Sequence, residues 1–371
     1  MASTYLSRTP ASAGNRKTWT WSGWVKRGIF GANSIFQAGT ASNNSLGIQF
    51  ETPTNNLQFF VYNGASVTVD VKTSQVFRDV SAWYHIVVAF DTTQATASNR
   101  VKLYVNGSQV TDLAATTYPS QNTDYNINNT NTHEIGRAVF GGNNYFDGSM
   151  AHVHFIDGTA YDASAFGETD ATTGIWKPKT APSVTYGTNG FFLKFENSGA
   201  FGTDSSGNGN TFTVNGTMTQ TLDTPSNVFA TLNPLNVPTS NAPTFSQGNL
   251  VSSTSDSGQF GGTSTLGVSS GKWYAEFKSA ETGGEEKEMV GVTHAPANDA
   301  RSNLNVGRSA ESFAIRFLDG LQSNNNIASA YGSAFSVGDI CQVALDLDNN
   351  QLFFGKNGQW GDGSGNFNQS T

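Results

Sequence analysis

Cysteine is almost absent from the sequence, since Cys341 is the only one among 371 residues. A single thiol cannot form a disulfide within the chain, and it excludes zinc sites built from cysteines. Cys341 lies in a run of alternating apolar residues at 340–345. We therefore expect a small buried side chain there rather than a reactive thiol.

Long apolar runs are also absent. No stretch approaches the roughly 18 apolar residues that a membrane-spanning helix needs. Residues 1–17 contain no apolar segment of the kind that defines a signal peptide. We therefore expect synthesis in a cytoplasm, with no signal peptide and no insertion into a membrane.

Charge is scarce. Charged residues make up 13% of the chain, against a usual share of about 25%, which excludes a charge-rich helical bundle or coiled coil. The 28 acidic residues outnumber the 20 basic ones and give a net charge of −8. We therefore expect no nucleic acid as a partner, because binding through phosphates requires a basic surface.

Glycine and aromatic residues are abundant, with 40 glycines and 12% aromatics. Short apolar runs recur every eight to twelve residues between Gly, Asn and Asp clusters, a pattern typical of β-sandwiches. The run at 83–90 is apolar throughout and predicts a central strand, and Asn106-Gly107 predicts a tight hairpin turn. The strand signals of the first half lie at 19–26, 34–38, 46–50, 57–62, 83–90 and 101–105.

These signals predict an all-β chain of two antiparallel sandwiches. Residues 1–17 are expected to form an N-terminal arm and 18–216 the first sandwich. Residues 217–250, rich in Pro, Asn and Thr, are expected to be a linker. The second sandwich is expected at 251–371. We predict that it is incomplete, with an open edge near Leu345 and Phe353, because the tail after the hairpin at 357–358 is polar and glycine-rich.

Several motifs resemble a known fold family. The segments 22–26, 83–88, 101–107 and 146–157 resemble the concanavalin A-like lectin/glucanase sandwich of laminin-G type. The turn Asp204-Ser-Ser-Gly-Asn-Gly-Asn210 resembles a motif of the same family. The resemblance implies two packed antiparallel sheets, and we expect Trp24, Val87 and Phe155 in the core of this domain.

The second half resembles a SPRY domain, itself a concanavalin A-like sandwich. The matching segments are 271–277, 290–292, 338–348 and 352–358. The ordered pair of domains resembles tail-associated or fibre-type virion proteins of bacteriophages. That resemblance implies a virion protein made in the host cytoplasm, and it implies other virion subunits and host-surface glycan or protein as partners, with self-association of the chain. A structural or decoration role in the virion is the alternative, and a polysaccharide depolymerase is a third hypothesis.

Catalytic patterns are missing. Glycoside hydrolysis needs two carboxylates on either side of the scissile bond, and the alternating acidic run of sandwich glucanases does not occur. Asp346 and Asp348 could share a face of a strand, but they flank a hairpin. His152 and His154 are expected to project together into solvent, because Val153 lies on the core side of the same strand. They have no evident third metal ligand, so we expect no metal site there. Because neither a carboxylate pair nor a Ser/His/Asp arrangement is evident, we expect no enzyme.

Two sets of residues are candidate binding sites. The polar loop at 112–145 could present a sugar platform, or it could pack on its own tyrosines. The turn at 204–210 has oxygen ligands suited to calcium, although the same residue types make turns without an ion. We expect no other cofactor. The platform set is Tyr118, Tyr125, Asn143, Asn144 and Tyr145, and the calcium set is Asp204, Ser206, Asn208 and Asn210.

Overall fold

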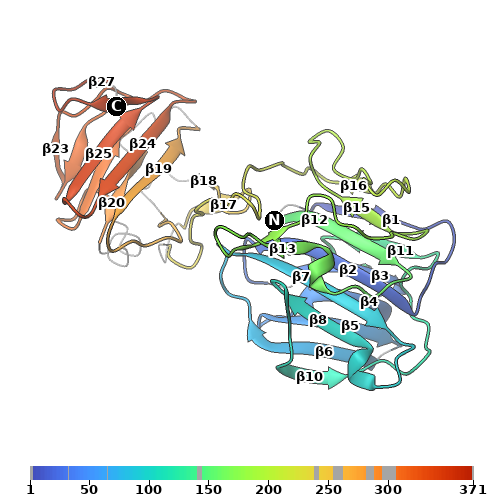
Figure 1. The fold of residues 1–371 in the computed structure, drawn as a ribbon. Coiled ribbons are helices and arrows are strands. Elements are labelled where there is room, and N and C mark those ends of the chain that lie inside the picture. Colours follow the sequence, from blue (N-terminus) through green and yellow to red (C-terminus); the bar gives the residue numbers. More distant parts are fainter. Residues whose placement is uncertain are drawn as a thin grey trace. The chain divides into compact units, whose positions relative to one another are not determined.

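A computed structural model shows a chain of β-strands joined by turns and loops (Figure 1). The described residues are 3–31, 33–64, 66–139, 144–237, 242–253, 262–280, 288–294 and 306–369. Among them, no helix has the length and apolarity to cross a membrane. The chain divides into two compact units, Met1–Phe229 and Ala230–Thr371.

The first unit contains two antiparallel sheets and a short ribbon, together with two single-turn 3₁₀ helices, η1 (Ala97–Asn99) and η2 (Ala163–Ala165). The eight-stranded sheet has the order β10 (Leu113–Thr117), β6 (Ser66–Val76), β5 (Asn56–Asn63), β4 (Asn44–Phe50), β3 (Asn33–Ala41), β11 (Thr132–Ile135), β1 (Tyr5–Arg8) and β16 (Thr213–Asn215). The six-stranded sheet has the order β15 (Phe191–Leu193), β12 (Gly148–Asp157), β2 (Thr18–Arg27), β7 (Trp83–Asp91), β8 (Val101–Val105) and β9 (Ser108–Gln109). The ribbon pairs β13 (Gly167–Thr169) with β14 (Trp176–Pro178).

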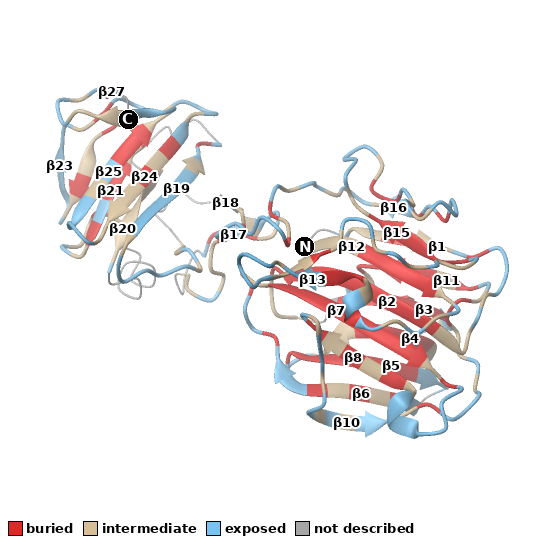
Figure 2. Cartoon of the chain, viewed as in Figure 1, coloured by how far each residue is buried: buried red, intermediate tan, exposed pale blue. Residues whose placement is uncertain are grey.

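The main core of this unit lies between its two sheets, where buried residues concentrate in Figure 2. Alternation along the strands decides which side chains enter it. Trp19 and Trp21 of β2 point inward, as does Phe90 of β7, and the rings of Trp19 and Phe90 stack with centroids 4.7 Å apart. The predicted sandwich is confirmed, and β7 is central because it pairs with both β2 and β8.

The other face of the six-stranded sheet is also buried. Val87 belongs to a second apolar cluster with Phe166, and Trp24 stacks on the ring of His85. The predicted burial of Trp24, Val87 and Phe155 in the core of the domain is confirmed, but only Phe155 lies between the two sheets. Because both faces of these strands are buried, apolar side chains in the sequence do not reveal which face packs against the eight-stranded sheet.

The edges of the first unit differ from the expected boundaries. Tyr5–Arg8 is not part of an arm but a strand of the eight-stranded sheet, where it pairs with β11 and β16. The expected linker starts inside the first unit, because Asp223 is buried against Lys26 of β2. Its carboxylate lies 2.6 Å from the Lys26 ammonium and accepts a hydrogen bond from the indole of Trp83 at 3.1 Å.

The second unit also contains two sheets. The five-stranded sheet has the order β19 (Lys272–Lys278), β24 (Ile340–Asp346), β25 (Gln351–Lys356), β26 (Gln359–Gly361) and β27 (Phe367–Gln369). The four-stranded sheet has the order β20 (Met289–Thr293), β21 (Ser312–Arg316), β22 (Gln322–Asn324) and β23 (Ile327–Ser329), and β17 (Thr244–Ser246) pairs with β18 (Val251–Ser253). Their core contains Cys341, as expected, and burial raises the pKa of its thiol to about 12.

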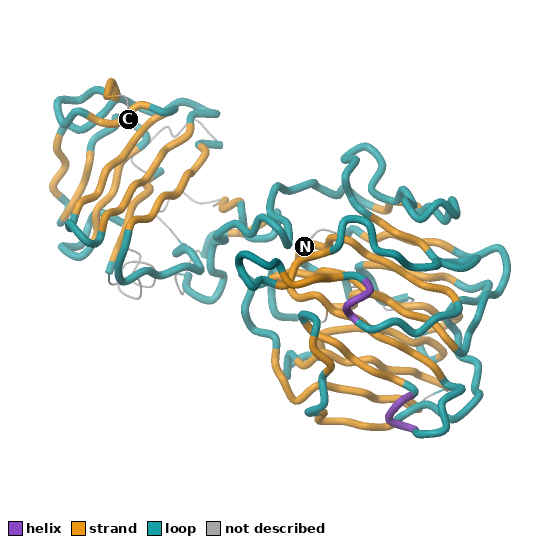
Figure 3. Tube along the Cα trace, viewed as in Figure 1, coloured by secondary structure: helices purple, strands orange, loops and turns teal. Residues whose placement is uncertain are grey.

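The polar tail of the second unit continues the sheet as β26 and β27 (Figure 3). Leu345 lies between Trp273 and Leu352, and Phe353 pairs with Ala344. The predicted open edge at Leu345 and Phe353 is therefore wrong. The tail pairs in spite of its composition because its few aromatic side chains are anchored, as when the ring of Phe367 packs against Phe335 at 5.5 Å.

Candidate functional site

The segment at 112–145 is not one long loop, because it contains β10 and β11, and its tyrosines are divided between two places. Tyr118 and Tyr125 are partly buried against the main core, where Tyr125 packs edge-on against Phe90 at 5.7 Å. Tyr145 lies beside Tyr5 of β1, with ring centroids 6.1 Å apart. Asn144 is exposed next to it, and Asn143 lies outside the described residues. The described contacts thus give these tyrosines packing roles and do not bring them into one platform.

The turn at 204–210 is held together by its own hydrogen bonds. One oxygen of Asp204 accepts the backbone N–H groups of Phe192 and Ser206, at 2.9 Å each. The other accepts the N–H of Asn210 at 2.8 Å and the hydroxyl of Ser206 at 2.8 Å. The side-chain oxygen of Asn210 accepts from the guanidinium of Arg8.

Asn208 has a similar role in this turn. Its amide donates to the carbonyls of Gly187 and Gly190, at 2.6 and 2.9 Å. The side-chain oxygens of Asp204, Ser206 and Asn210 therefore accept N–H and O–H donors, and the cation among their described partners is Arg8. The observed geometry is that of a structural turn.

Removal of divalent ions with EDTA is expected to change the melting temperature of the first domain little. In contrast, Asp204→Ala should lower its free energy of unfolding by about 2 to 3 kcal/mol, because three backbone N–H groups lose a charged acceptor. Thermal melts of both proteins, with and without EDTA, measure the two effects. A fall of many degrees in EDTA alone would identify the turn as a calcium site instead.

The predicted solvent-facing histidine pair does not form. His154 is buried, its ring stacks on Phe192 at 3.9 Å, and its Nδ1 lies 3.0 Å from the hydroxyl of Tyr186. His152 has a φ of 48° at an irregularity where the register of β12 against β2 shifts. The prediction failed because Phe166 and Tyr186 cover the outer face of the sheet and pack against the ring of His154. Burial lowers the pKa of both imidazoles.

A serine–histidine contact occurs on the same buried face, between Ser22 Oγ and His85 Nε2 at 2.9 Å. Trp176 donates its indole N–H to His85 Nδ1 at 3.0 Å. Since an indole nitrogen only donates, Nδ1 is the acceptor and Nε2 carries the proton. A histidine that activates serine needs a bare Nε2, and burial lowers the pKa of His85 to about 3. The pair is therefore structural rather than nucleophilic.

The acidic pair at 346 and 348 has a structural role too. Asp346 accepts the backbone N–H groups of Asp348 and Asn349, each at 3.1 Å. Asp348 accepts the N–H of Gly271 at 2.9 Å. Both carboxylates thus cap the turns around their strands. Among the described residues, no group of three or more His, Cys, Asp or Glu side chains could hold a metal ion.

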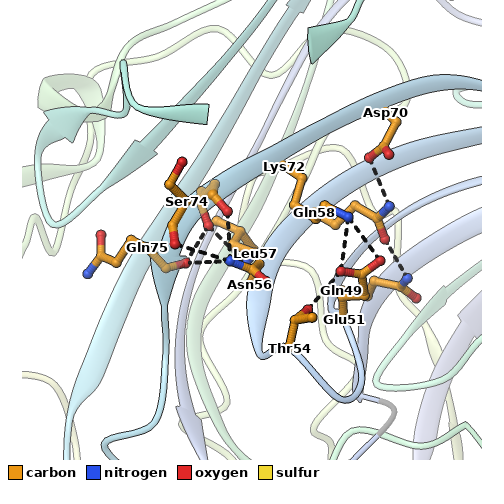
Figure 4. A network of polar contacts seen from close by, with 11 residues as sticks. Gln49, Glu51, Thr54, Asn56, Leu57, Gln58, Asp70, Lys72, Ser74 and Gln75 are labelled. Atoms are coloured by element: carbon orange, nitrogen blue, oxygen red, sulfur yellow. Dashed lines mark hydrogen bonds and ion pairs between the residues drawn. The ribbon is translucent and has the colours of Figure 1, made fainter. Parts of the chain in front are cut away.

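The outer side of the eight-stranded sheet carries a network of polar contacts (Figure 4). We call this surface the polar face and define it by the outward side chains of β4, β5 and β6, namely Gln49, Gln58, Phe60, Tyr62, Asp70 and Lys72. Gln49 donates to the Gln58 carbonyl at 2.8 Å, and Gln58 donates to Asp70 at 2.9 Å. One row of hydrogen bonds therefore crosses three strands.

The ends of this row are fixed by further contacts. Lys72 Nζ lies 3.1 and 3.0 Å from the two oxygens of Glu51, which also accepts the hydroxyl of Thr54 at 2.8 Å. The amide of Asn56 donates to the carbonyls of residues 73–75, where the register of β5 against β6 shifts. These contacts hold the polar side chains of the face in defined positions.

Aromatic rings adjoin the polar row. The ring of Phe60 lies over Gly47, where an added Cβ would sit 2.9 Å from its Cζ, and it packs edge-on against Tyr62 at 5.3 Å. Gln37 pairs with Gly47, which in turn pairs with Phe60. Gln37 is buried, and its Oε1 has no hydrogen-bond partner within the described part of the chain. Gln58 and Phe60 are themselves buried, at 8% and 3% exposed, so the accessible groups of the face come from Gln49, Tyr62, Asp70 and Lys72. An amide, a carboxylate and one exposed ring suit a hydroxyl-rich ring ligand.

Sequence reasoning missed the polar face. The runs at 46–50 and 57–62 were interpreted as strands only, although alternation already separates Gln58, Phe60 and Tyr62 from the core side chains between them. That alternation is the signal that could have identified the face.

Both units are concanavalin A-like sandwiches by their fold. More particularly, residues 2–165 match the family model described as the concanavalin A-like lectin/glucanases superfamily, of laminin-G type, and residues 272–369 match the SPRY domain. The chain therefore contains a laminin-G-type domain and a SPRY domain, as the sequence motifs predicted.

Solved structures with similar folds include a heptameric pentraxin from Limulus polyphemus (17% identity, 43% of this chain and 72% of that chain covered, TM-score 0.30). Domain 4 of the arabinanase AbnA from Geobacillus stearothermophilus, in complex with arabinotriose, shares 16% identity over 40% of this chain and 64% of that chain, with a TM-score of 0.31. Domains LG4-5 of mouse laminin α1 share 14% identity over 43% of this chain and 42% of theirs, with a TM-score of 0.30. The search of curated proteins gave no match.

Proposed function

We propose that the chain is a non-enzymatic bacteriophage virion protein whose first domain binds glycan on the host surface through the polar face. The observation that carries the glycan proposal is the row of Gln49, Gln58 and Asp70 next to the exposed ring of Tyr62. The match to a lectin-type family model supports the same ligand class. The virion assignment rests on the resemblance of the ordered domain pair to phage tail and fibre proteins.

The chemistry of the face fits a sugar chain. The Gln49 amide uses one N–H within the row, which leaves its second N–H for a ligand hydroxyl. The Tyr62 ring is 36% exposed and can stack on the C–H face of a pyranose. Because the row is already hydrogen-bonded, binding orders few side chains, and this preorganisation favours affinity.

A structural role in the virion is the second candidate. It is favoured by apolar side chains exposed on the SPRY domain, such as Ile327 at 69% and Phe313 at 48%. Contacts with other virion subunits or with further copies of the chain would cover them. The hypothesis of a depolymerase has the least support, because the pair Asp346 and Asp348 caps turns.

A glycan array with the purified chain tests the proposed function. Tyr62→Ala and Asp70→Ala should each lower the apparent affinity for the bound glycan about tenfold or more, which corresponds to about 1.4 kcal/mol. Ile175→Ser serves as the control, because Ile175 is an exposed apolar side chain between β13 and β14, outside the eight-stranded sheet.

Two further measurements separate the alternatives. The purified chain should block phage infection if it binds the host, and it should not do so if its role is confined to virion structure. Release of reducing sugars from host polysaccharide would establish a depolymerase. Glycan binding that both face variants retain in full would contradict the proposed site.

A further inference from the structure

A second surface with aromatic and polar side chains lies on the SPRY domain. Alternation directs Cys341, Val343 and Phe354 of the five-stranded sheet into the core. Its outward side chains include Tyr274 of β19 and Phe353 of β25, which are 53% and 43% exposed. We call this surface the aromatic face. It consists of Tyr274, Glu276, Gln342, Ala344, Phe353, Gly355 and Trp360.

The strand register aligns these residues in two adjacent rows. Tyr274 pairs with Ala344, which pairs with Phe353. In the next row Glu276 pairs with Gln342, which pairs with Gly355, and Gly355 pairs with Trp360. Ala344 therefore places only a methyl group between Tyr274 and Phe353, and Gly355 has no side chain between Gln342 and Trp360.

The aromatic rings converge over the glycine. An added Cβ at Gly355 would lie 3.2 Å from Trp360 Cε3 and 3.1 Å from Gln342 Oε1. The rings of Tyr274 and Trp360 meet edge-on with centroids 6.4 Å apart. A substituent at Gly355 would push these groups apart, so glycine preserves their present arrangement.

A hydrogen-bonded relay of side chains runs between the rings. The Tyr274 hydroxyl donates to Glu276 Oε1 at 2.6 Å and accepts from the amide of Gln342 at 2.8 Å. Gln342 Oε1 in turn accepts the backbone N–H of Gly358 at 2.6 Å. The second oxygen of Glu276 and the second N–H of Gln342 have no partner in the described part of the chain. They can therefore bind hydroxyl groups of a ligand.

The charges of this surface favour a neutral ligand. Lys272 is paired with Asp346 at 3.1 Å, and Lys278 follows Glu276 on the same side of β19. The two lysines and two carboxylates cancel. We propose that the aromatic face is a second carbohydrate-binding site, separate from the polar face, which takes neutral pyranose chains by ring stacking on Tyr274, Phe353 and Trp360. This inference does not depend on glycan binding by the first domain.

The test uses the full chain with the polar face already disabled by Tyr62→Ala and Asp70→Ala. The probes are cellohexaose, maltohexaose, xylohexaose and mannohexaose, with hexagalacturonate as an acidic comparison, and binding is measured by titration calorimetry. At least one neutral hexasaccharide should bind, and adding Tyr274→Ala or Trp360→Ala should weaken it about tenfold or more. Phe313→Ala is the matched control, because this ring is 48% exposed on the other sheet of the same domain.

Melting curves of each variant establish that it is folded, and Gln342→Leu provides a variant that removes only the amide and should also weaken binding. Three results would overturn the proposal: no binding of any neutral hexasaccharide, equal binding after Tyr274→Ala and Phe313→Ala, or a preference for hexagalacturonate. A dimer that dissociates on Tyr274→Ala, in the absence of sugar binding, would assign the face to a second copy of the chain.

Discussion

Asp223→Ala is expected to lower the free energy of unfolding of the first domain by about 3 to 5 kcal/mol. Lys26 and Asp223 form an ion pair at 2.6 Å, and each side chain is only 1% exposed. Removing the carboxylate leaves a buried ammonium group without a counter-charge. It also removes the acceptor for the Trp83 indole and for the backbone N–H of Phe229. Urea unfolding, followed by tryptophan fluorescence, measures the loss.

Two control proteins make this prediction specific. The double variant Lys26→Met/Asp223→Leu removes both charges and should recover most of the lost stability, since buried pairs can be replaced by apolar groups of similar size. Asp170→Ala breaks the more exposed pair with Lys177 and should have a far smaller effect. If Asp223→Ala destabilises the domain no more than Asp170→Ala does, burial of the Lys26–Asp223 pair does not add to its contribution to stability.

The same ion pair explains why the sequence predicted the end of the first domain at residue 216, whereas the first unit extends to Phe229. The segment after residue 216 has the Pro, Asn and Thr content of a linker, and composition cannot show that Asp223 is buried. The pairing partner, Lys26, lies 197 positions away in the sequence. Long-range pairs of this kind depend on the completed fold, so local composition contains no signal for them.

The strands themselves were predictable because their signals are local. Asn106 and Gly107 both have positive φ, as the predicted hairpin turn requires, and they join β8 to β9. The face of Val87 was not predictable, because the six-stranded sheet is covered on both sides. β27 was missed because a strand at the edge of a sheet tolerates polar residues once Phe367 is anchored.

The candidate site was less predictable than the fold. Residue types in the turn at 204–210 suit calcium and N–H donors equally well, so only the hydrogen bonds distinguish the two interpretations. On the polar face, alternation gives the side of each strand, but the alignment of Gln49 with Gln58 and Asp70 depends on register. The register between β5 and β6 shifts along the strands, and no local sequence pattern specifies such a shift.

Acidification from pH 7 to pH 5 is expected to destabilise the first domain by about 6 kcal/mol, from three buried histidines. Burial lowers the pKa of His85 to about 3 and that of His133 to about 4, and it places the pKa of His154 well below its ordinary value. In the unfolded chain each imidazole has a pKa near 6.5. Below that value the unfolded chain binds protons that the folded domain excludes, so stability falls as the pH falls.

The geometry of His133 explains why its neutral form is required. Its Nε2 accepts the backbone N–H of Asn128 at 2.9 Å, and its Nδ1 lies 2.8 Å from the carbonyl of Asn131 and donates to it. A second proton on Nε2 would place its N–H against the backbone N–H of Asn128, so that two donors would face each other with no acceptor. Each such histidine therefore contributes about 2 kcal/mol to the loss at pH 5.

Urea unfolding of the full chain at pH 7, 6 and 5, with fluorescence of the buried tryptophans, checks the prediction. His133→Gln should reduce the pH 7 to pH 5 loss by about 2 kcal/mol, whatever its effect on stability at pH 7, because one titrating group is gone. His294→Gln is the matched control, since His294 is exposed in the second unit, and it should leave the pH dependence unchanged. A wild-type loss below about 1 kcal/mol would mean that the buried imidazoles accept protons in the folded domain, contrary to the packing around His85 and His133.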